Sequence, residues 1–158
     1  MRSVLFIRHA KSSWDDPLMN DFDRTLNDRG KKEAVQMAGH LIEKKVPIDS
    51  FISSPAKRAR KTAALFAKAF GIAEDLIQFK TQLYLPVEEA FQQVIELLPD
   101  EIVHPAIFSH NPGITDYVNT LTGQIRVDNI PTCGIFGIKI AADSWADFKK
   151  AKKEFWFF

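Results

Sequence analysis

Basic side chains follow three short apolar runs in this sequence. They are Arg8 and His9 after the first run, Arg58 shortly after the second, and His110 after the third. Imidazole nitrogens act as nucleophiles or as acid–base groups, and guanidinium groups bind phosphate through paired N–H donors. These residue types therefore indicate chemistry on a phosphorylated substrate. Because clustered cations oppose a metal ion, we expect neither a metal nor a cofactor at these residues.

The apolar runs have the length and composition of short buried strands, and amphipathic helical segments separate them. Strands are expected at 4–7, 51–52, 76–79, 106–108, 135–140 and 155–158. Helices are expected at 28–45, 55–71, 87–98 and 112–121. This alternation predicts one α/β domain over residues 1–158 with a largely parallel sheet.

The three strands with basic residues at their ends would form one site if they are neighbours in the sheet. In open parallel sheets, ligands bind beyond the carboxyl ends of the strands. Pro55 and Pro112 are expected at the starts of two helices, whose free N–H groups would face the same crevice. Such a crevice favours a doubly charged oxyanion, with phosphate as the obvious candidate. No Walker-type or G-x-G-x-x-G loop indicates a nucleotide site.

Two arginines on the second helix compete for a place in that crevice. Arg58 and Arg60 lie about 200° apart on a helical wheel. Arg58 is nearer the start of the helix, and long helical side chains lean toward that end. We therefore predict that Arg58 faces the crevice and that Arg60 lies on the surface.

The composition excludes several classes of protein. The chain has 158 residues, with 21 Lys and Arg against 20 Asp and Glu, so its formal charge is +1. This balance argues against a nucleic-acid partner. The apolar run 4–7 is too short for a membrane span or a signal peptide. A single cysteine, Cys133, fits a reducing compartment and is expected to be an inert packed thiol. We expect a cytoplasmic protein with no membrane partner.

Four blocks of the sequence resemble motifs of the histidine phosphatase superfamily, and in detail the branch of small SixA-type phosphohistidine phosphatases. They are the nucleophile motif at 5–14, a second block at 21–34, an arginine motif at 53–63 and a histidine motif at 109–113. The resemblance implies a three-layer sandwich, with helices on both faces of the sheet. It also implies a phosphatase of signalling pathways. Its partner would be a phosphorylated protein, such as a histidine-phosphotransfer domain, or a small phosphate ester.

The resemblance also implies roles for individual residues. His9 would be the nucleophile that becomes phosphorylated, and Arg8, Arg58 and His110 would hold the phosphoryl group. Neighbouring cations should lower the pKa of His9 and keep its ring neutral. Arg24 would add a phosphate contact, although pairing with a nearby carboxylate is the alternative. Ser12 is a further candidate contact.

A proton donor for the leaving group has no recognisable motif here. Glu88 and Glu89 lie in the region where larger relatives carry a catalytic glutamate, but the surrounding residues do not assign either of them. An alkoxide needs a proton as it departs, whereas the imidazole of phosphohistidine leaves neutral once solvent has protonated its ring. We therefore predict a metal-independent phosphatase that prefers phosphohistidine to alkyl phosphates.

Three other functions compete with this prediction. A small-molecule phosphomonoesterase would use the same residues. A mutase would need the missing proton donor and a closing lid. A catalytically silent module that binds phosphorylated proteins belongs to a different class. The presence of His9 and its partners counts against this function, because a silent relative is free to lose them. The sequence assigns no oligomeric state, and the aromatic run 155–158 fits either a dimer edge or an ordinary last strand.

Overall fold

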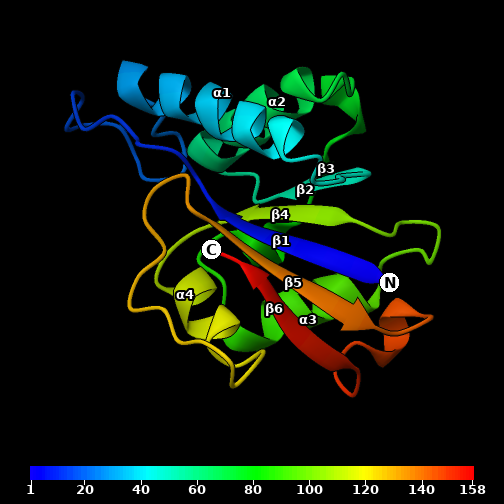
Figure 1. Ribbon diagram of the computed structural model, residues 1–158. Coiled ribbons are helices and arrows are strands. Elements are labelled where there is room, and N and C mark those ends of the chain that lie inside the picture. Colours follow the sequence, from blue (N-terminus) through cyan, green and yellow to red (C-terminus); the bar gives the residue numbers. More distant parts are fainter.

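A computed structural model describes residues 1–158, and a single six-stranded sheet forms its centre (Figure 1). The strand order is β3-β2-β4-β1-β5-β6. The strands are β1 (Arg2–Arg8), β2 (Ser50–Ser53), β3 (Gln78–Phe79), β4 (Pro105–Ser109), β5 (Ile135–Ala141) and β6 (Lys152–Phe157). The four strands from β3 to β1 run parallel, while β5 and β6 add two antiparallel pairings. The prediction of a largely parallel sheet is confirmed.

Helices cover both faces of this sheet and complete three layers. In Figure 1, α1 (Asp28–Glu43) and α2 (Lys57–Ala69) lie on one face, and α3 (Glu88–Glu96) and α4 (Gly113–Val118) lie on the other. Single 3₁₀ turns occur at η1 (Glu74–Leu76), η2 (Thr81–Leu83) and η3 (Trp145–Asp147). Leu76 therefore belongs to a turn, and the strand expected at 76–79 is shorter than predicted.

Strand β1 contributes side chains to the hydrophobic cores on both faces. Successive residues of a strand point to opposite faces. Accordingly, Val4 and Phe6 pack in the core beneath α3 and α4, while Leu5 and Ile7 pack in the core beneath α1 and α2. A strand that is buried on both faces shows no polar alternation. This explains why residues 4–7 form an unbroken apolar run.

The two helices predicted to start at a proline begin after that residue. The expectation that α2 starts at Pro55 is wrong, because the helix begins at Lys57. The hydroxyl of Ser54 accepts a hydrogen bond from the Ala56 N–H at 3.2 Å, and the Lys57 N–H donates to the carbonyl of Phe22 at 2.9 Å. These N–H groups are thus already used and do not face an open crevice. Helix α4 likewise begins at Gly113, one residue after Pro112.

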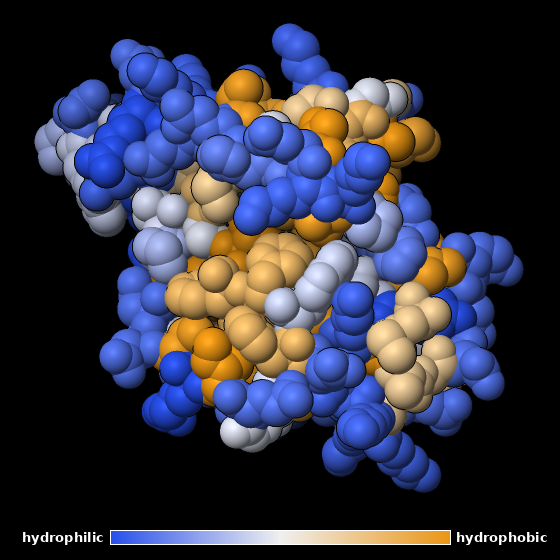
Figure 2. Space-filling model, in the orientation of Figure 1, coloured by the Kyte–Doolittle hydropathy of each residue, from blue (hydrophilic) through white to orange (hydrophobic).

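The aromatic run at the end of the chain forms the outer strand β6. Figure 2 shows apolar side chains gathered across the face where β5 and β6 lie, below the hydrophilic surface of α1. Trp156 and Phe157 are half-buried against the core beneath α1 and α2, whereas Phe158 is exposed. No helix in this structure is both long enough and apolar enough to cross a membrane.

Candidate active site

The sheet order brings the three polar strand ends together. Strands β2, β4 and β1 are neighbours, and Arg8 at the end of β1 pairs in register with Ser109 at the end of β4. Beyond these ends, the His9 N–H donates to the Ser109 carbonyl at 3.1 Å. A cleft of about 270 Å³ opens here. It is lined by all six residues that the sequence singled out, namely Arg8, His9, Ser12, Arg24, Arg58 and His110.

The hydrogen bonds of His9 define which ring nitrogen is free to react. Its Nδ1 lies 2.7 Å from the Ala10 carbonyl, which can only accept, so Nδ1 carries the proton. The Nε–H of Arg58 donates to Nε2 of His9 at 3.3 Å, and a guanidinium can only donate. Both contacts require the neutral tautomer with a lone pair on Nε2. The nitrogen of this imidazole with a lone pair free to react is therefore Nε2.

Burial lowers the pKa of His9, the Ala10 carbonyl opposes this effect, and the cations Arg58, Arg8 and Arg24 add to it, so that the pKa falls to about 4. The direction agrees with the sequence prediction, which named only the cations. Desolvation is the larger cause, because His9 is almost fully enclosed. The ring is neutral, and hence nucleophilic, throughout the physiological pH range.

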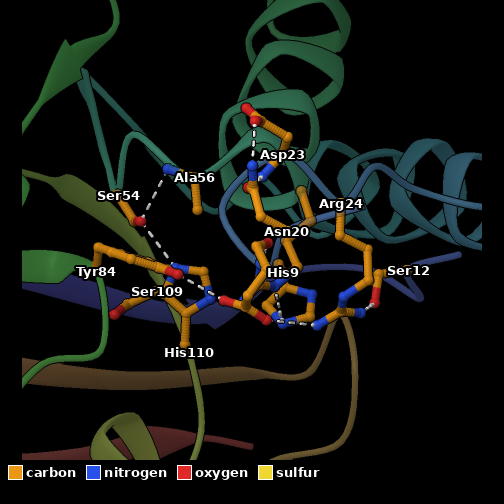
Figure 3. Close-up of polar contacts among 12 residues, drawn as sticks. His9, Ser12, Asn20, Asp23, Arg24, Ser54, Ala56, Tyr84, Ser109 and His110 are labelled. Carbon is orange, nitrogen blue, oxygen red and sulfur yellow. Dashed lines mark hydrogen bonds and ion pairs between the residues drawn. The ribbon is translucent and has the colours of Figure 1, made fainter. Parts of the chain in front are cut away.

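His110 lies beside His9, with 5.2 Å between their ring centroids. Its Nε2 forms a hydrogen bond of 2.7 Å with the hydroxyl of Ser54, as Figure 3 shows. Its Nδ1 is buried and has no partner. Burial, followed by the influence of His9 and Arg58, lowers the pKa of His110 to about 3. A neutral ring with one unpartnered nitrogen thus lies beside the ring of His9.

Arg58 projects from the first turn of α2 into the cleft, while Arg60 is exposed. The prediction that separated these two arginines is confirmed. Besides its bond to His9, Arg58 donates through Nη1 to the backbone carbonyl of Asp21 at 2.6 Å and through Nη2 to its carboxylate at 3.0 Å. The carboxylate therefore fixes the plane of the guanidinium group.

Arg24 occupies the opposite side of His9 from His110 in Figure 3. Its guanidinium donates to the hydroxyl of Ser12 and pairs with Asp21 at 3.2 Å. The indole ring of Trp14 covers it, with 3.8 Å between the guanidinium carbon and the ring centroid. Arg24 thus pairs with a carboxylate, as one of the two alternatives had it, and it also lines the cleft, while its contact with phosphate stays a prediction.

Three buried side-chain nitrogens lack a hydrogen-bond partner, and no other buried side-chain nitrogen or oxygen does. They are Nε of Arg8, Nε of Arg24 and Nδ1 of His110. All three belong to residues that line the same cleft. Because buried polar groups are normally satisfied, this concentration marks a place prepared for a ligand rich in acceptor atoms.

The backbone around His9 is held by long-range contacts that the sequence did not predict. Thr62, one turn after Arg58 on α2, accepts a hydrogen bond from the Ala10 N–H at 3.0 Å. Gly30 lies so close to this segment that a β-carbon would stand 2.1 Å from the Lys11 carbonyl oxygen. The Cys133 N–H donates to the carbonyls of Arg8 and His9. Burial raises the pKa of the Cys133 thiol to about 12, consistent with an inert packed thiol.

Asp21 is the functional residue whose importance the sequence did not reveal. It is the only carboxylate that lines the cleft. The spacing of three residues to Arg24 was a visible signal, but it suggested only a local pair. Glu88 and Glu89 lie at the start of α3 and do not line the cleft.

Comparisons with known proteins agree with this geometry. A family model of the histidine phosphatase superfamily (branch 1) matches residues 4–83, slightly more than half of the chain. The Mycobacterium leprae protein ML1117, which is uncharacterised, is 32% identical over 85% of this chain and 88% of its own length.

Two solved structures share the architecture. One is SixA from Agrobacterium tumefaciens, which is assigned as a phosphohistidine phosphatase. It is 28% identical and superposes with a TM-score of 0.77, covering 87% of this chain and 90% of its own. The protein histidine phosphatase SixA in complex with tungstate has a TM-score of 0.82 over 98% of this chain and 94% of its own. At 20% identity, the second likeness concerns the fold alone.

Proposed function

The chain belongs to the histidine phosphatase superfamily, and on this basis we propose that it hydrolyses phosphohistidine on a protein substrate through an intermediate on Nε2 of His9. The superfamily supports phosphatase activity in general. The protein substrate, the P–N bond and the covalent intermediate are our proposal. Its cellular setting would be phosphorelay signalling in the cytoplasm.

The observation that carries the proposal is the set of three unpartnered nitrogens in one cleft. Nε of Arg8 and Nε of Arg24 each present an N–H donor, and His110 presents Nδ1. A phosphoryl group has three equatorial oxygens that can accept hydrogen bonds from the two arginine N–H groups, and phosphoryl transfer depends mainly on positioning and on charge around these oxygens. The tungstate found in a SixA relative is an oxyanion of similar shape.

The first step is attack by the lone pair of His9 Nε2 on phosphorus. A P–N bond to His9 forms, and the P–N bond to the substrate imidazole breaks, with solvent supplying the proton to the departing ring. Because Nδ1 of His9 keeps its proton, the phosphorylated ring is cationic. The Ala10 carbonyl, 2.7 Å away, stabilises that charge.

The second step is attack by water on the same phosphorus atom. The bond between phosphorus and His9 Nε2 breaks, and the ring leaves as the neutral tautomer that the resting site holds. Water delivers its protons to the phosphate product and to solvent. Arg8, Arg24 and Arg58 stabilise the oxygens in both steps by charge and by directed N–H groups.

The preference for a P–N bond follows from the absence of an acid in the cleft. The sole carboxylate there, Asp21, has a pKa of about 2, since hydrogen bonds from Tyr84, Arg24 and Arg58 outweigh the opposing effect of burial. At neutral pH it is ionised and cannot protonate an alkoxide. Solvent can protonate a phosphohistidine ring before it departs, so that substrate needs no acid from the protein.

The decisive experiment measures phosphate release from a phosphohistidine-bearing protein domain, from an aryl phosphate and from a sugar phosphate, all in the presence of a chelator. We expect kcat/KM to be highest for the P–N substrate and His9→Ala to abolish turnover. His40→Ala, which removes an exposed histidine, is the matched control. Equal kcat/KM for the sugar phosphate would favour a small-molecule phosphomonoesterase. Phosphate binding without turnover would favour a silent binding module.

A further inference from the structure

The Asp21 carboxylate occupies part of the cationic cleft itself. It accepts hydrogen bonds from Arg58 Nη2 at 3.0 Å, from Arg24 Nη2 at 3.2 Å and from the Tyr84 hydroxyl at 2.6 Å. A third N–H donor, on Arg58 Nη1, is engaged by the backbone carbonyl of Asp21. One residue of the loop thus uses donors on two of the arginines that would hold a phosphoryl group.

This arrangement lowers the affinity of the cleft for any anion. A phosphate oxygen that approaches Arg58 or Arg24 meets guanidinium N–H groups already engaged by Asp21. It also meets a negative charge on the wall of a partly desolvated pocket, where like charges repel more strongly than in water. The residues between Asp15 and Asn20 are exposed, and the Asp21 side chain is itself about half exposed at 47%. Packing in the surrounding loop therefore does little to prevent the carboxylate from moving away from Arg58 and Arg24 when an anion binds.

We propose that Asp21 sets the affinity of the site for phosphate, by competing with the anion for Arg58 and Arg24, and that it thereby promotes release of the inorganic phosphate product. This inference rests on the proposed function and adds a specific role at the same site. A hydrolase must discard phosphate after each turnover, and a cleft with three arginines and no opposing charge would retain it. The Asp21 carboxylate re-forms its hydrogen bonds with the two guanidinium groups as the product leaves.

The test compares phosphate binding by the wild type with binding by Asp21→Asn. Asparagine keeps the shape and an acceptor oxygen for Arg58 but removes the charge. We expect inorganic phosphate to bind at least about fivefold more tightly by titration calorimetry, as removal of a nearby like charge requires. Its inhibition constant and the KM for substrate should fall together. The matched control is Asp15→Asn, because the Asp15 side chain is exposed and forms no hydrogen bond or ion pair.

Asp21→Ala provides a second measurement, since it removes the charge together with the acceptor atoms. Tighter phosphate binding in both variants, with Asp15→Asn unchanged, supports the proposal. Unchanged or weaker phosphate binding in both would overturn it and leave Asp21 as a residue that only orients the arginines. If the wild type releases no phosphate from any of the substrates, or if His9→Ala leaves turnover unchanged, the proposed function fails instead, so the two failures are distinguishable.

Discussion

The two ends of strand β1 each carry a buried or half-buried arginine, but in only one of them does every guanidinium nitrogen have a hydrogen-bond acceptor. At the amino end, Arg2 donates to four backbone carbonyls at distances between 2.5 and 3.2 Å. At the carboxyl end, Arg8 donates to the Ile130 carbonyl at 3.0 Å, and its Nε has no partner. A buried arginine whose three nitrogens all have acceptors stabilises the fold, whereas one with a buried nitrogen that lacks an acceptor is available to bind a ligand. Hydrogen-bond saturation therefore separates a structural arginine from a functional one.

The largest effect on activity is expected from a substitution of Arg8. Arg8→Lys keeps the charge but loses the planar set of donors that two phosphoryl oxygens require. We expect kcat/KM to fall about 100- to 1,000-fold, comparable to the loss of one directed donor in other enzymes. Steady-state kinetics on a phosphohistidine-bearing domain measures this, with thermal unfolding to confirm an intact fold. Activity within fivefold of the wild type would show that Arg8 is structural like Arg2.

The reverse pattern is expected at the saturated end. Arg2→Met removes a donor from four carbonyls, of which that of Ile102 keeps the Trp145 indole N–H as a second donor. It also removes a cation above the ring of Trp145. We expect the free energy of unfolding to fall by about 2–4 kcal/mol. Because this site is remote from the cleft, kcat of the folded protein should stay unchanged. Urea unfolding and kinetics on the same sample measure both, and an unchanged unfolding free energy would contradict the structural role.

The histidines at the two ends should differ in how they link stability to pH. His9 has its pKa lowered to about 4 in the folded state, from an unfolded value of 6.5. Below pH 6.5 the unfolded chain therefore binds more protons, so stability is lost as pH falls from 6.5 toward 4. Each unit of pKa difference corresponds to about 1.4 kcal/mol.

Urea unfolding between pH 7.5 and 4.5 measures this loss, and His9→Gln should make it clearly smaller. At the amino end, burial also lowers the pKa of His104, but the nearby Asp49 charge opposes it. His104→Gln should therefore change the slope less than His9→Gln does. Equal slopes in the wild type and in His9→Gln would refute this linkage.

The smallest effect is expected at one of two tryptophans that contact arginines near the two ends of β1. Trp14 is exposed and stacks over Arg24 at 3.8 Å, whereas the fully buried Trp145 lies 5.0 Å from Arg2. Trp14→Ala should raise KM about two- to fivefold, as expected for an exposed cation–π contact. We expect kcat and stability to stay the same. Kinetics at fixed ionic strength measures this, and an unchanged KM would mean that Trp14 does not help to hold Arg24.

Local patterns in the sequence predicted much of the fold. Apolar run length and helical spacing located β1, β2, β4 and the two long helices, because both reflect how one segment presents its own side chains. The start of α2 was misplaced because the carbonyl of Phe22, 35 residues away in the chain, accepts the Lys57 N–H. Contacts of this kind have no signature in the local sequence.

By itself, the sequence determined which residue types stand at the strand ends and that Arg58, rather than Arg60, faces inward. Only the tertiary structure decided that β2, β4 and β1 are neighbours, that Asp21 lies among the arginines, and that three nitrogens stay unpaired. The physical reason is that periodicity is a property of one segment. Whether a buried donor finds an acceptor depends on residues brought together from distant parts of the chain.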